Sequence, residues 1–166
     1  MLEHRATVEI VVEKRERRLS VYQGAALCAA YRIALGRNPA VDKTAEGDEA
    51  TPLGEFYICA KNPRSKYFLS LCLSYPGTAH ARRGLAAGLI SASEYAAILE
   101  AHEARRMPPQ KTRLGGEIYI HGRAAADSGA ATAGRDWTRG CIALDNRAMA
   151  EIYALAELGT PVRIVE

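Results

Sequence analysis

The first half of the chain contains several short apolar stretches separated by polar segments, and in the first of these stretches apolar and polar residues alternate. Between Thr7 and Glu13, valine or isoleucine stands at every second position, a period that is typical of a β-strand with one buried face. Together with four further short stretches bounded by polar or turn-forming residues, this predicts five strands, over residues 7–13, 19–22, 27–35, 54–60 and 68–74. Several short strands in succession indicate a sandwich or barrel core rather than a parallel sheet.

Polar segments separate these strands. The charged run from Lys14 to Arg18 is predicted to be a solvated hairpin tip, and residues 40–52 are predicted to form a loop. The run Asn62-Pro63-Arg64-Ser65 is rich in turn-forming residues, so it is expected to connect the fourth and fifth strands.

Helical spacing of apolar residues appears in the second half. Ser91 and Glu94 match a capping box, in which each side chain satisfies a free backbone N–H of the other residue. The apolar residues behind them predict a helix over 93–106, ended by Met107-Pro108-Pro109. This helix reads as an insertion between strands that could cover a cleft.

The remainder is predicted to be a strand over 117–121, a loop over 122–134, a helix capped by Asp145 or Asn146, and a last strand over 161–165. The predicted fold is therefore mainly β, with a helical insertion and a C-terminal helix. With 166 residues, the chain has the length of one domain, and we expect residues 1–166 to form a single one.

Composition excludes several classes of protein. The chain is 48% hydrophobic and 25% charged, which is typical of globular proteins. Its formal charge of +3 is too small to indicate a nucleic-acid partner. No apolar run approaches the roughly 20 residues that a membrane helix needs, and no secretory signal is visible between Met1 and Arg18.

Four cysteines occur, and none has the spacing of a zinc site. Cys28, Cys59 and Cys72 each lie inside an apolar stretch, so they are expected to be small buried side chains, with a disulfide between two of them left open. Cys141 has a different setting. Gly140 allows a tight turn that can aim backbone amides at one point, and Arg139 and the following helix start are expected to lower the thiol pKa.

A nucleophilic cysteine also needs a base, and His121, which precedes Gly122 at the end of a predicted strand, is the candidate. Ile120-His121-Gly122 is followed, after fifteen residues, by the run from Thr138 to Leu144, Thr-Arg-Gly-Cys-Ile-Ala-Leu. This pattern resembles the signature of the L,D-transpeptidase catalytic domain family (YkuD-type). Upstream, Ala34-Leu35-Gly36 and the run Thr51-Pro52-Leu53-Gly54-Glu55-Phe56 are similar to the same family, so the resemblance extends from about Thr7 to Val165.

The resemblance implies a β-sandwich-like fold and a thioester mechanism. Cys141 would be acylated by the carbonyl of an L,D-peptide, and His121 would be its base, held by a backbone carbonyl. The amides of Arg139, Gly140 and Cys141 would receive the oxyanion, with Thr138 and Gly122 in support. No metal and no cofactor is implied.

Two positions depart from the family pattern: Arg139 stands where a histidine is usual, and Ala143 stands where an arginine is common. Asp136-Trp137-Thr138 matches a subgroup with members that could be hydrolytic, so transfer and hydrolysis both stay open. Trp137 either walls the cleft or packs in the core.

Four further residues are weaker candidates. Tyr75 and Ser74 either line the donor groove or belong to the core. Arg123 and Arg135 either meet a substrate carboxylate or are surface charges.

The function predicted is a cysteine L,D-transpeptidase acting on peptidoglycan stem peptides. The alternative is an L,D-carboxypeptidase or amidase that uses the same site, and a binding module without chemistry is a third possibility, disfavoured because both Cys141 and His121 are present. No G-x-S-x-G elbow or Walker loop occurs, which disfavours a serine hydrolase and a nucleotide-binding protein. The substrate implies a periplasmic or cell-wall location.

Overall fold

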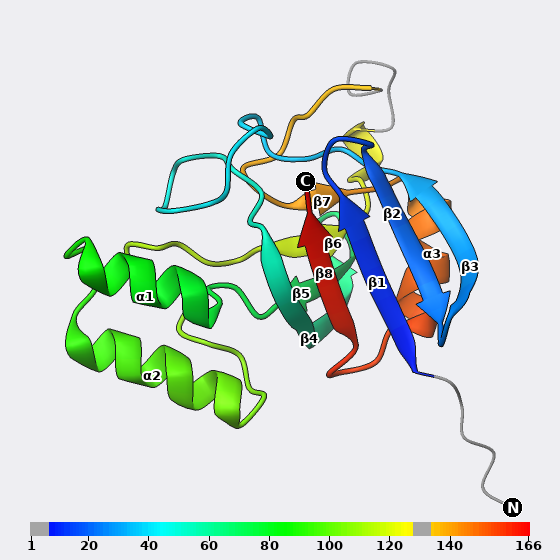
Figure 1. Cartoon of the computed structure of the whole chain (residues 1–166). Helices are drawn as coiled ribbons and strands as arrows, with labels where there is room; N and C mark the ends of the chain where they lie inside the picture. The colour runs from blue at the N-terminus through cyan, green and yellow to red at the C-terminus, as the bar shows by residue number, and fades with distance from the viewer. Residues whose placement is uncertain (1–6, 128–133) are drawn as a thin grey trace, which may run out of the picture.

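The computed structural model describes residues 7–127 and 134–166. Within them, eight strands form one sheet in the order β3-β2-β1-β8-β4-β5-β6-β7 (Figure 1). The strands are β1 (Val8–Glu13), β2 (Arg18–Gln23), β3 (Ala26–Arg32), β4 (Gly54–Ser65), β5 (Phe68–Leu73), β6 (Tyr119–His121), β7 (Ile142–Ala143) and β8 (Pro161–Val165). The helices are α1 (Thr78–Ala86), α2 (Ala92–Glu103), α3 (Asn146–Leu155) and the short 3-10 turn η1 (Ala125–Asp127).

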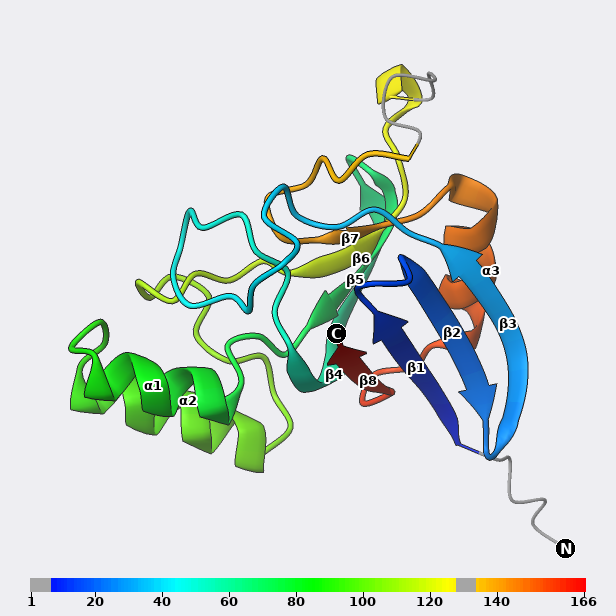
Figure 2. The same ribbon diagram turned by 45° about the horizontal axis from the view of Figure 1, so that its top comes forward.

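The sheet folds over on itself at β4. The first residues of β4 pair with β8, whereas from Ile58 onward β4 pairs with β5. The two halves enclose a core of aliphatic side chains from nearly every strand, to which α3 adds Met149 and Ile152. Figures 1 and 2 show β1, β2, β3 and β8 on one side of the molecule, and β5, β6 and β7 on the other. The predicted mainly β fold, with a helical insertion and a C-terminal helix, is confirmed.

The hairpin between β4 and β5 turns later than the sequence indicates. We expected the turn at residues 62–65, but β4 continues to Ser65 and the chain turns at Lys66 and Tyr67. Pro63 is tolerated in the strand because this part of β4 pairs only with β5, and the edge of a sheet can accommodate a residue without an N–H. The correction matters because it moves Lys66 and Tyr67 to the hairpin tip.

The helical insertion contains two helices, of which only the second was predicted. Helix α2 begins at Ala92, and its capping box forms as expected: the Ser91 hydroxyl accepts from the Glu94 amide, and the Glu94 carboxylate accepts from the Ser91 amide. Helices α1 and α2 pack through a small core that includes Ile98 and Leu114. Figure 2 shows the pair projecting beside β4. The N-cap of α3 is Asp145.

The charged run after β1 is not merely a solvated tip. Lys14 is only 1% exposed, and its ammonium group donates to the carbonyl oxygens of Val41 and Thr51, each at 2.7 Å. Arg17 forms a bidentate ion pair with Asp136. Two of the five charged residues therefore hold distant loops in place, because a fully buried ammonium is stable only when carbonyl or carboxylate oxygens replace its water.

The cysteines also differ from expectation. Cys28 is exposed on the edge strand β3, Cys59 is half-buried, and only Cys72 is fully buried among the three. All four cysteines are free thiols. Residues 128–133 of the predicted 122–134 loop lie outside the described residues, as do residues 1–6 of the segment inspected for a signal. In the described part of the chain, no helix is long and apolar enough to cross a membrane.

Candidate active site

Strands β6 and β7 bring His121 and Cys141 to one face of the sheet. The two strands run parallel, with Ile120 beside Ile142 and His121 beside Ala143. Extending this register by one residue places Cys141 beside Tyr119. Because residues paired across a ladder point to the same face, and every second residue shares that face, the side chains of His121 and Cys141 lie on a common side, two positions apart along neighbouring strands.

A tight turn presents Cys141. The buried Thr138 hydroxyl donates to the Cys141 carbonyl oxygen at 2.7 Å and accepts from the Gly140 amide at 3.1 Å. Gly140 has φ +131, and a Cβ there would lie 2.8 Å from the Ala50 carbonyl oxygen, so only glycine fits. The Gly140 amide is therefore used inside the turn, which corrects its expected role as an oxyanion donor. Within residues 7–127 and 134–166, the amides of Arg139 and Cys141 donate no hydrogen bond.

His121 is held as a buried, neutral imidazole. It is 2% exposed, and its Nδ1 lies 2.7 Å from the Gly122 carbonyl oxygen. A carbonyl oxygen can only accept, so Nδ1 carries the proton and the Nε2 lone pair is left to accept another. Burial lowers the pKa of His121, and the nearby charge of Lys66 lowers it further, against the raising effect of the Gly122 hydrogen bond.

The residue after His121 has no room for a side chain. A Cβ on Gly122 would lie 2.5 Å from Asn146 Oδ1 and 2.9 Å from the Tyr67 carbonyl oxygen. The Asn146 side chain occupies this space and binds the backbone of Arg123: its Oδ1 accepts from the Arg123 amide, and its Nδ2 donates to the Arg123 carbonyl oxygen. The start of α3 thus fixes the chain that leaves His121.

The Cys141 thiol is protonated at rest. Its Sγ accepts from the Tyr119 amide and donates to the Glu117 carbonyl oxygen, both at 3.4 Å. Burial raises the pKa of Cys141 to about 11, although the hydrogen bond from the Tyr119 amide and the charges of the lysines at 43 and 66 lower it in part. The expected depression of this pKa is wrong for two reasons: the Arg139 side chain is exposed, and α3 begins at Asn146, beyond β7, so its N-terminus is not adjacent to the thiol.

Aromatic rings enclose His121. Tyr67 stacks on the imidazole with ring centroids 4.5 Å apart, and Trp137 meets both rings edge-on, at 5.7 Å from His121 and 6.1 Å from Tyr67. Lys66 Nζ lies 5.1 Å from the Tyr67 ring centroid. Sequence reasoning considered Trp137 as one wall of the cleft but missed Tyr67 and Lys66, because residues 62–65 indicated a turn, whereas β4 continues to Ser65.

Other predicted residues lie elsewhere. Tyr75 is fully buried, and its hydroxyl donates to the Leu114 carbonyl oxygen at 2.6 Å. Ser74 is equally buried and accepts from the Tyr57 amide. Both belong to the core, so of the two roles considered for them the core role is confirmed and the assignment of Tyr75 to substrate binding is wrong. Arg123 is half-buried next to Gly122, whereas Arg135 is exposed.

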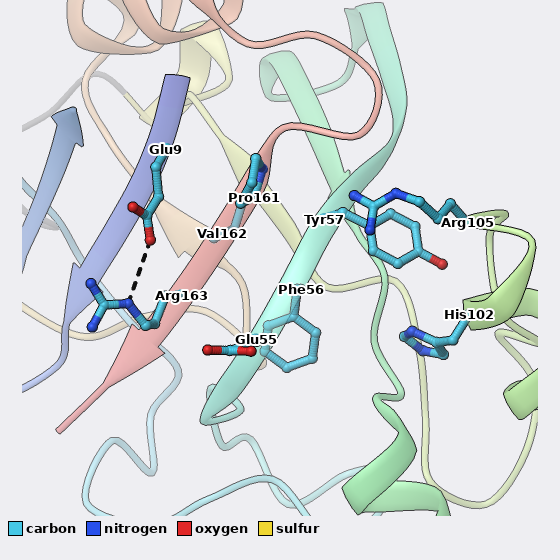
Figure 3. A pocket seen from close by; sticks show the side chains of 9 residues that line it. All are labelled: Glu9, Glu55, Phe56, Tyr57, His102, Arg105, Pro161, Val162 and Arg163. Atoms are coloured by element: carbon cyan, nitrogen blue, oxygen red, sulfur yellow. Dashed lines mark ion pairs between the residues drawn. The ribbon is translucent and has the colours of Figure 1, made fainter. Parts of the chain in front are cut away.

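A separate cavity of about 380 Å³ opens between the outer face of β4 and β8 and the end of α2 (Figure 3). Arg105 covers the Tyr57 ring there, and His102 Nε2 lies 2.8 Å from the Pro76 carbonyl oxygen. Neither His121 nor Cys141 lines this cavity. It is therefore distinct from the candidate active site.

Comparison with solved structures supports the fold. The helical cell shape determining protein Pgp2 from Campylobacter jejuni is 24% identical, with a TM-score of 0.68 over 96% of this chain and 48% of that one. Bd1075 from Bdellovibrio bacteriovorus is 20% identical, with a TM-score of 0.61 over 99% and 49%. L,D-transpeptidase 1 from Mycobacterium tuberculosis is 13% identical, with a TM-score of 0.53 over 96% and 62%.

This chain thus spans about half the length of the first two of these proteins. No curated protein sequence matches it. The sequence model of the YkuD family, the L,D-transpeptidase catalytic domain, matches residues 7–164, which include the whole of the site described above. The chain therefore belongs to the L,D-transpeptidase catalytic domain (YkuD) family.

Proposed function

We propose that this chain is a cysteine-dependent L,D-transpeptidase that acts on peptidoglycan stem peptides, with Cys141 as nucleophile and His121 as base. The observation that carries the proposal is that the neutral imidazole of His121 and the thiol of Cys141 lie on the same face of the sheet. The backbone amides of Arg139 and Cys141, beside this thiol, donate no hydrogen bond within the described residues. A nucleophile, a base with a free lone pair and N–H donors are the three parts that acyl transfer requires. Residues 1–166 would act as one catalytic domain.

In the first half-reaction, the Cys141 thiol leaves its contacts with Glu117 and Tyr119 and passes its proton to His121 Nε2. The thiolate sulfur attacks the carbonyl carbon of the stem peptide, and the amides of Arg139 and Cys141 receive the negative oxygen. The C–N bond then breaks, the departing amine takes the proton from His121, and a thioester remains on Cys141. Thr138 supports this step by keeping the Gly140 amide within the turn.

In the second half-reaction, an acceptor amine gives a proton to His121 and attacks the thioester carbonyl, and the thiol is released. Water in place of the amine would make the same site a carboxypeptidase or an amidase. The acceptor therefore separates the two functions. Peptidoglycan lies outside the cytoplasmic membrane, so we propose a periplasmic or cell-wall location.

The test is incubation with a defined tetrapeptide muropeptide, followed by mass spectrometry of the products. Cys141→Ala and His121→Gln are the inactive variants, and Cys28→Ser, at an exposed cysteine on the edge strand, is the matched control. A cross-linked dimer with released D-alanine, absent in the two inactive variants, supports transpeptidation. Tripeptide without dimer supports the carboxypeptidase.

Further substrates complete the experiment. Cleavage only of a cross-linked or lipoprotein-linked muropeptide supports the amidase. Absence of any product from all of these substrates, with a folded protein, overturns the enzymatic proposal. If the unaltered protein and Cys141→Ala give equal amounts of product, the assignment of Cys141 as the nucleophile is overturned.

A further inference from the structure

Two cysteines, Cys59 and Cys72, oppose each other at the base of the β4–β5 hairpin, outside the candidate active site. The register passes from Ile58 opposite Leu73 to Ala60 opposite Cys72, so Cys59 is the extra residue of a β-bulge that faces Cys72. Cys59 Sγ donates to the Cys72 carbonyl oxygen at 3.5 Å, and Cys72 Sγ donates to the Leu73 carbonyl oxygen at 3.6 Å.

This placement suits a disulfide. The Cα partner of Cys72 is Ala60, at the roughly 4.5–5.5 Å of an antiparallel pair, and in the bulge Cys59 opposes the same Cys72. A disulfide spans roughly 4.4–6.8 Å between Cα atoms, so the bulge brings Cys59 to the side of Cys72 that a disulfide needs. Cys141 is two strands away from Cys72, because Cys72 pairs with Tyr119 and Tyr119 stands beside Cys141. At about 4.8 Å per strand, that distance is too long for direct bonding. Cys59 is therefore the partner within reach of Cys72.

The two thiols differ in a way that suits exchange chemistry. Cys59 is half-buried, and the neighbouring Cys72 side chain lowers its pKa. Cys72 is fully buried, and the neighbouring Cys59 side chain together with burial raises its pKa. Cys59 is thus the accessible attacking thiol, and Cys72 is the resolving thiol behind it.

The segment between the two cysteines carries the tip of the hairpin. Residues 60–71 include Lys66 and Tyr67, and the Tyr67 ring rests on His121. A covalent bond at the base of this hairpin would restrict its opening. The redox state of the two cysteines would then change how firmly the hairpin tip holds the Tyr67 ring against His121.

We propose that Cys59 and Cys72 form a reversible intramolecular disulfide by exchange with an oxidised dithiol carrier. The Cys59 thiolate attacks one sulfur of the carrier disulfide and releases the first carrier thiol. Cys72 then attacks the Cys59 sulfur of the mixed disulfide and releases the second. Two protein thiols lose two electrons, the carrier disulfide gains them, and the two protons end on the carrier sulfurs.

The experiment uses the whole chain equilibrated in a series of glutathione redox buffers, acid-quenched, alkylated and digested with trypsin. Trypsin separates the two cysteines, so the disulfide appears as peptide 44–61 linked to peptide 67–82. The linked pair is expected in the protein and in Cys28→Ser, but not in Cys59→Ser. Oxidation is expected to raise Tm by roughly 5–10 °C, as closure of a loop of this length allows.

Each outcome decides one part of the proposal. Cys59 and Cys72 recovered only as separate alkylated or glutathionylated thiols, in buffers that glutathionylate the exposed Cys28, overturn the disulfide. This result comes from the unaltered protein, so it holds even if a variant fails to fold. Hydrogen exchange of the backbone amides in residues 60–71 is compared between the oxidised and the reduced protein. If the disulfide forms and this exchange is not slower, the proposed restriction of hairpin opening is overturned. Neither readout uses peptidoglycan, so the result is independent of the proposed enzymatic function.

Discussion

The phenol ring of Tyr67 lies on the imidazole of His121, with the ring planes inclined by only 22°. Trp137 meets both rings from the side. The imidazole is thus confined by stacking on its face and by the Gly122 carbonyl oxygen at Nδ1. Its remaining nitrogen, Nε2, is the atom through which His121 would accept the proton of Cys141. Because the stacked Tyr67 ring fixes the plane of the imidazole, Tyr67 is a positioning residue for His121.

Replacement of Tyr67 by alanine is expected to lower kcat by about three- to tenfold with little change in KM, because ring stacking contributes about 0.5–1.5 kcal/mol to the orientation of the imidazole. Tyr67→Phe retains the ring and is expected to stay within about twofold of the unaltered protein. Steady-state kinetics on the tetrapeptide muropeptide checks both, and ¹⁵N NMR reports the tautomer of His121. Equal kcat for Tyr67→Ala and Tyr67→Phe would contradict the assignment.

The pKa of His121 gives a pH dependence of stability. Burial holds this pKa below its ordinary value of 6.5, so at pH values below 6.5 the unfolded chain binds a proton that the folded chain does not. The stabilising contribution of neutral His121 is complete above pH 6.5 and is lost as the pH falls toward the folded-state pKa. Thermal unfolding between pH 5 and 8 should show a shallower decline for His121→Gln, whose side chain does not titrate. Parallel curves would contradict the lowered pKa.

The thiol of Cys141 should alkylate slowly at neutral pH. With a pKa of about 11, only about one thiol in ten thousand is ionised at pH 7. The rate with iodoacetamide is therefore expected to rise about tenfold per pH unit from pH 7 to 10. Lys66→Met should slow it further, because the Lys66 charge lowers this pKa, whereas Lys111→Met, at an exposed lysine, should not. Site-resolved mass spectrometry measures the rates, and a plateau below pH 8 would exclude a raised pKa.

Local sequence predicted the tight turn at Gly140, although neither the bond that its amide makes to Thr138 nor the raised pKa of Cys141 was predicted. Thr138, Gly140 and Cys141 are within four residues, and the contacts that shape the turn join these residues to each other. The same holds for the Ser91–Glu94 capping box. Such contacts can be read from spacing because both partners lie in one short segment.

Long-range contacts could not be predicted in this way. Tyr67 reaches His121 only because β4 continues through Pro63, and a proline there is acceptable only once the pairing of β4 is known. Lys14 is buried because loops 27 and 37 residues away supply its carbonyl acceptors. The sequence pattern of one short segment does not predict the register of a bulged hairpin. It also does not predict which carbonyl acceptors a distant loop supplies.

Lys14 should consequently be a stability determinant. Lys14→Met keeps the length of the side chain but leaves the Val41 and Thr51 carbonyl oxygens without their charged donor. We expect a loss of about 2–4 kcal/mol in the free energy of unfolding, since hydrogen bonds to buried charged groups contribute more than those between neutral groups. Urea denaturation measures it, with Arg15→Met on the exposed side of the same turn as control. Equal stability of the two variants would exclude a structural role for Lys14.

Variants at Thr138 test whether the hydroxyl only stabilises the turn or also orients the backbone amides next to Cys141. Thr138→Ala removes the donor to the Cys141 carbonyl oxygen and the acceptor of the Gly140 amide, and we expect a loss of about 1–3 kcal/mol in the free energy of unfolding. Because the freed Gly140 amide and the Arg139 and Cys141 amides can then reorient, kcat should fall by about tenfold or more while KM changes little. Thr138→Ser retains the hydroxyl and should restore both quantities. Destabilisation of Thr138→Ala with an unchanged kcat would show that the hydroxyl holds the turn together without orienting the amides that face the substrate.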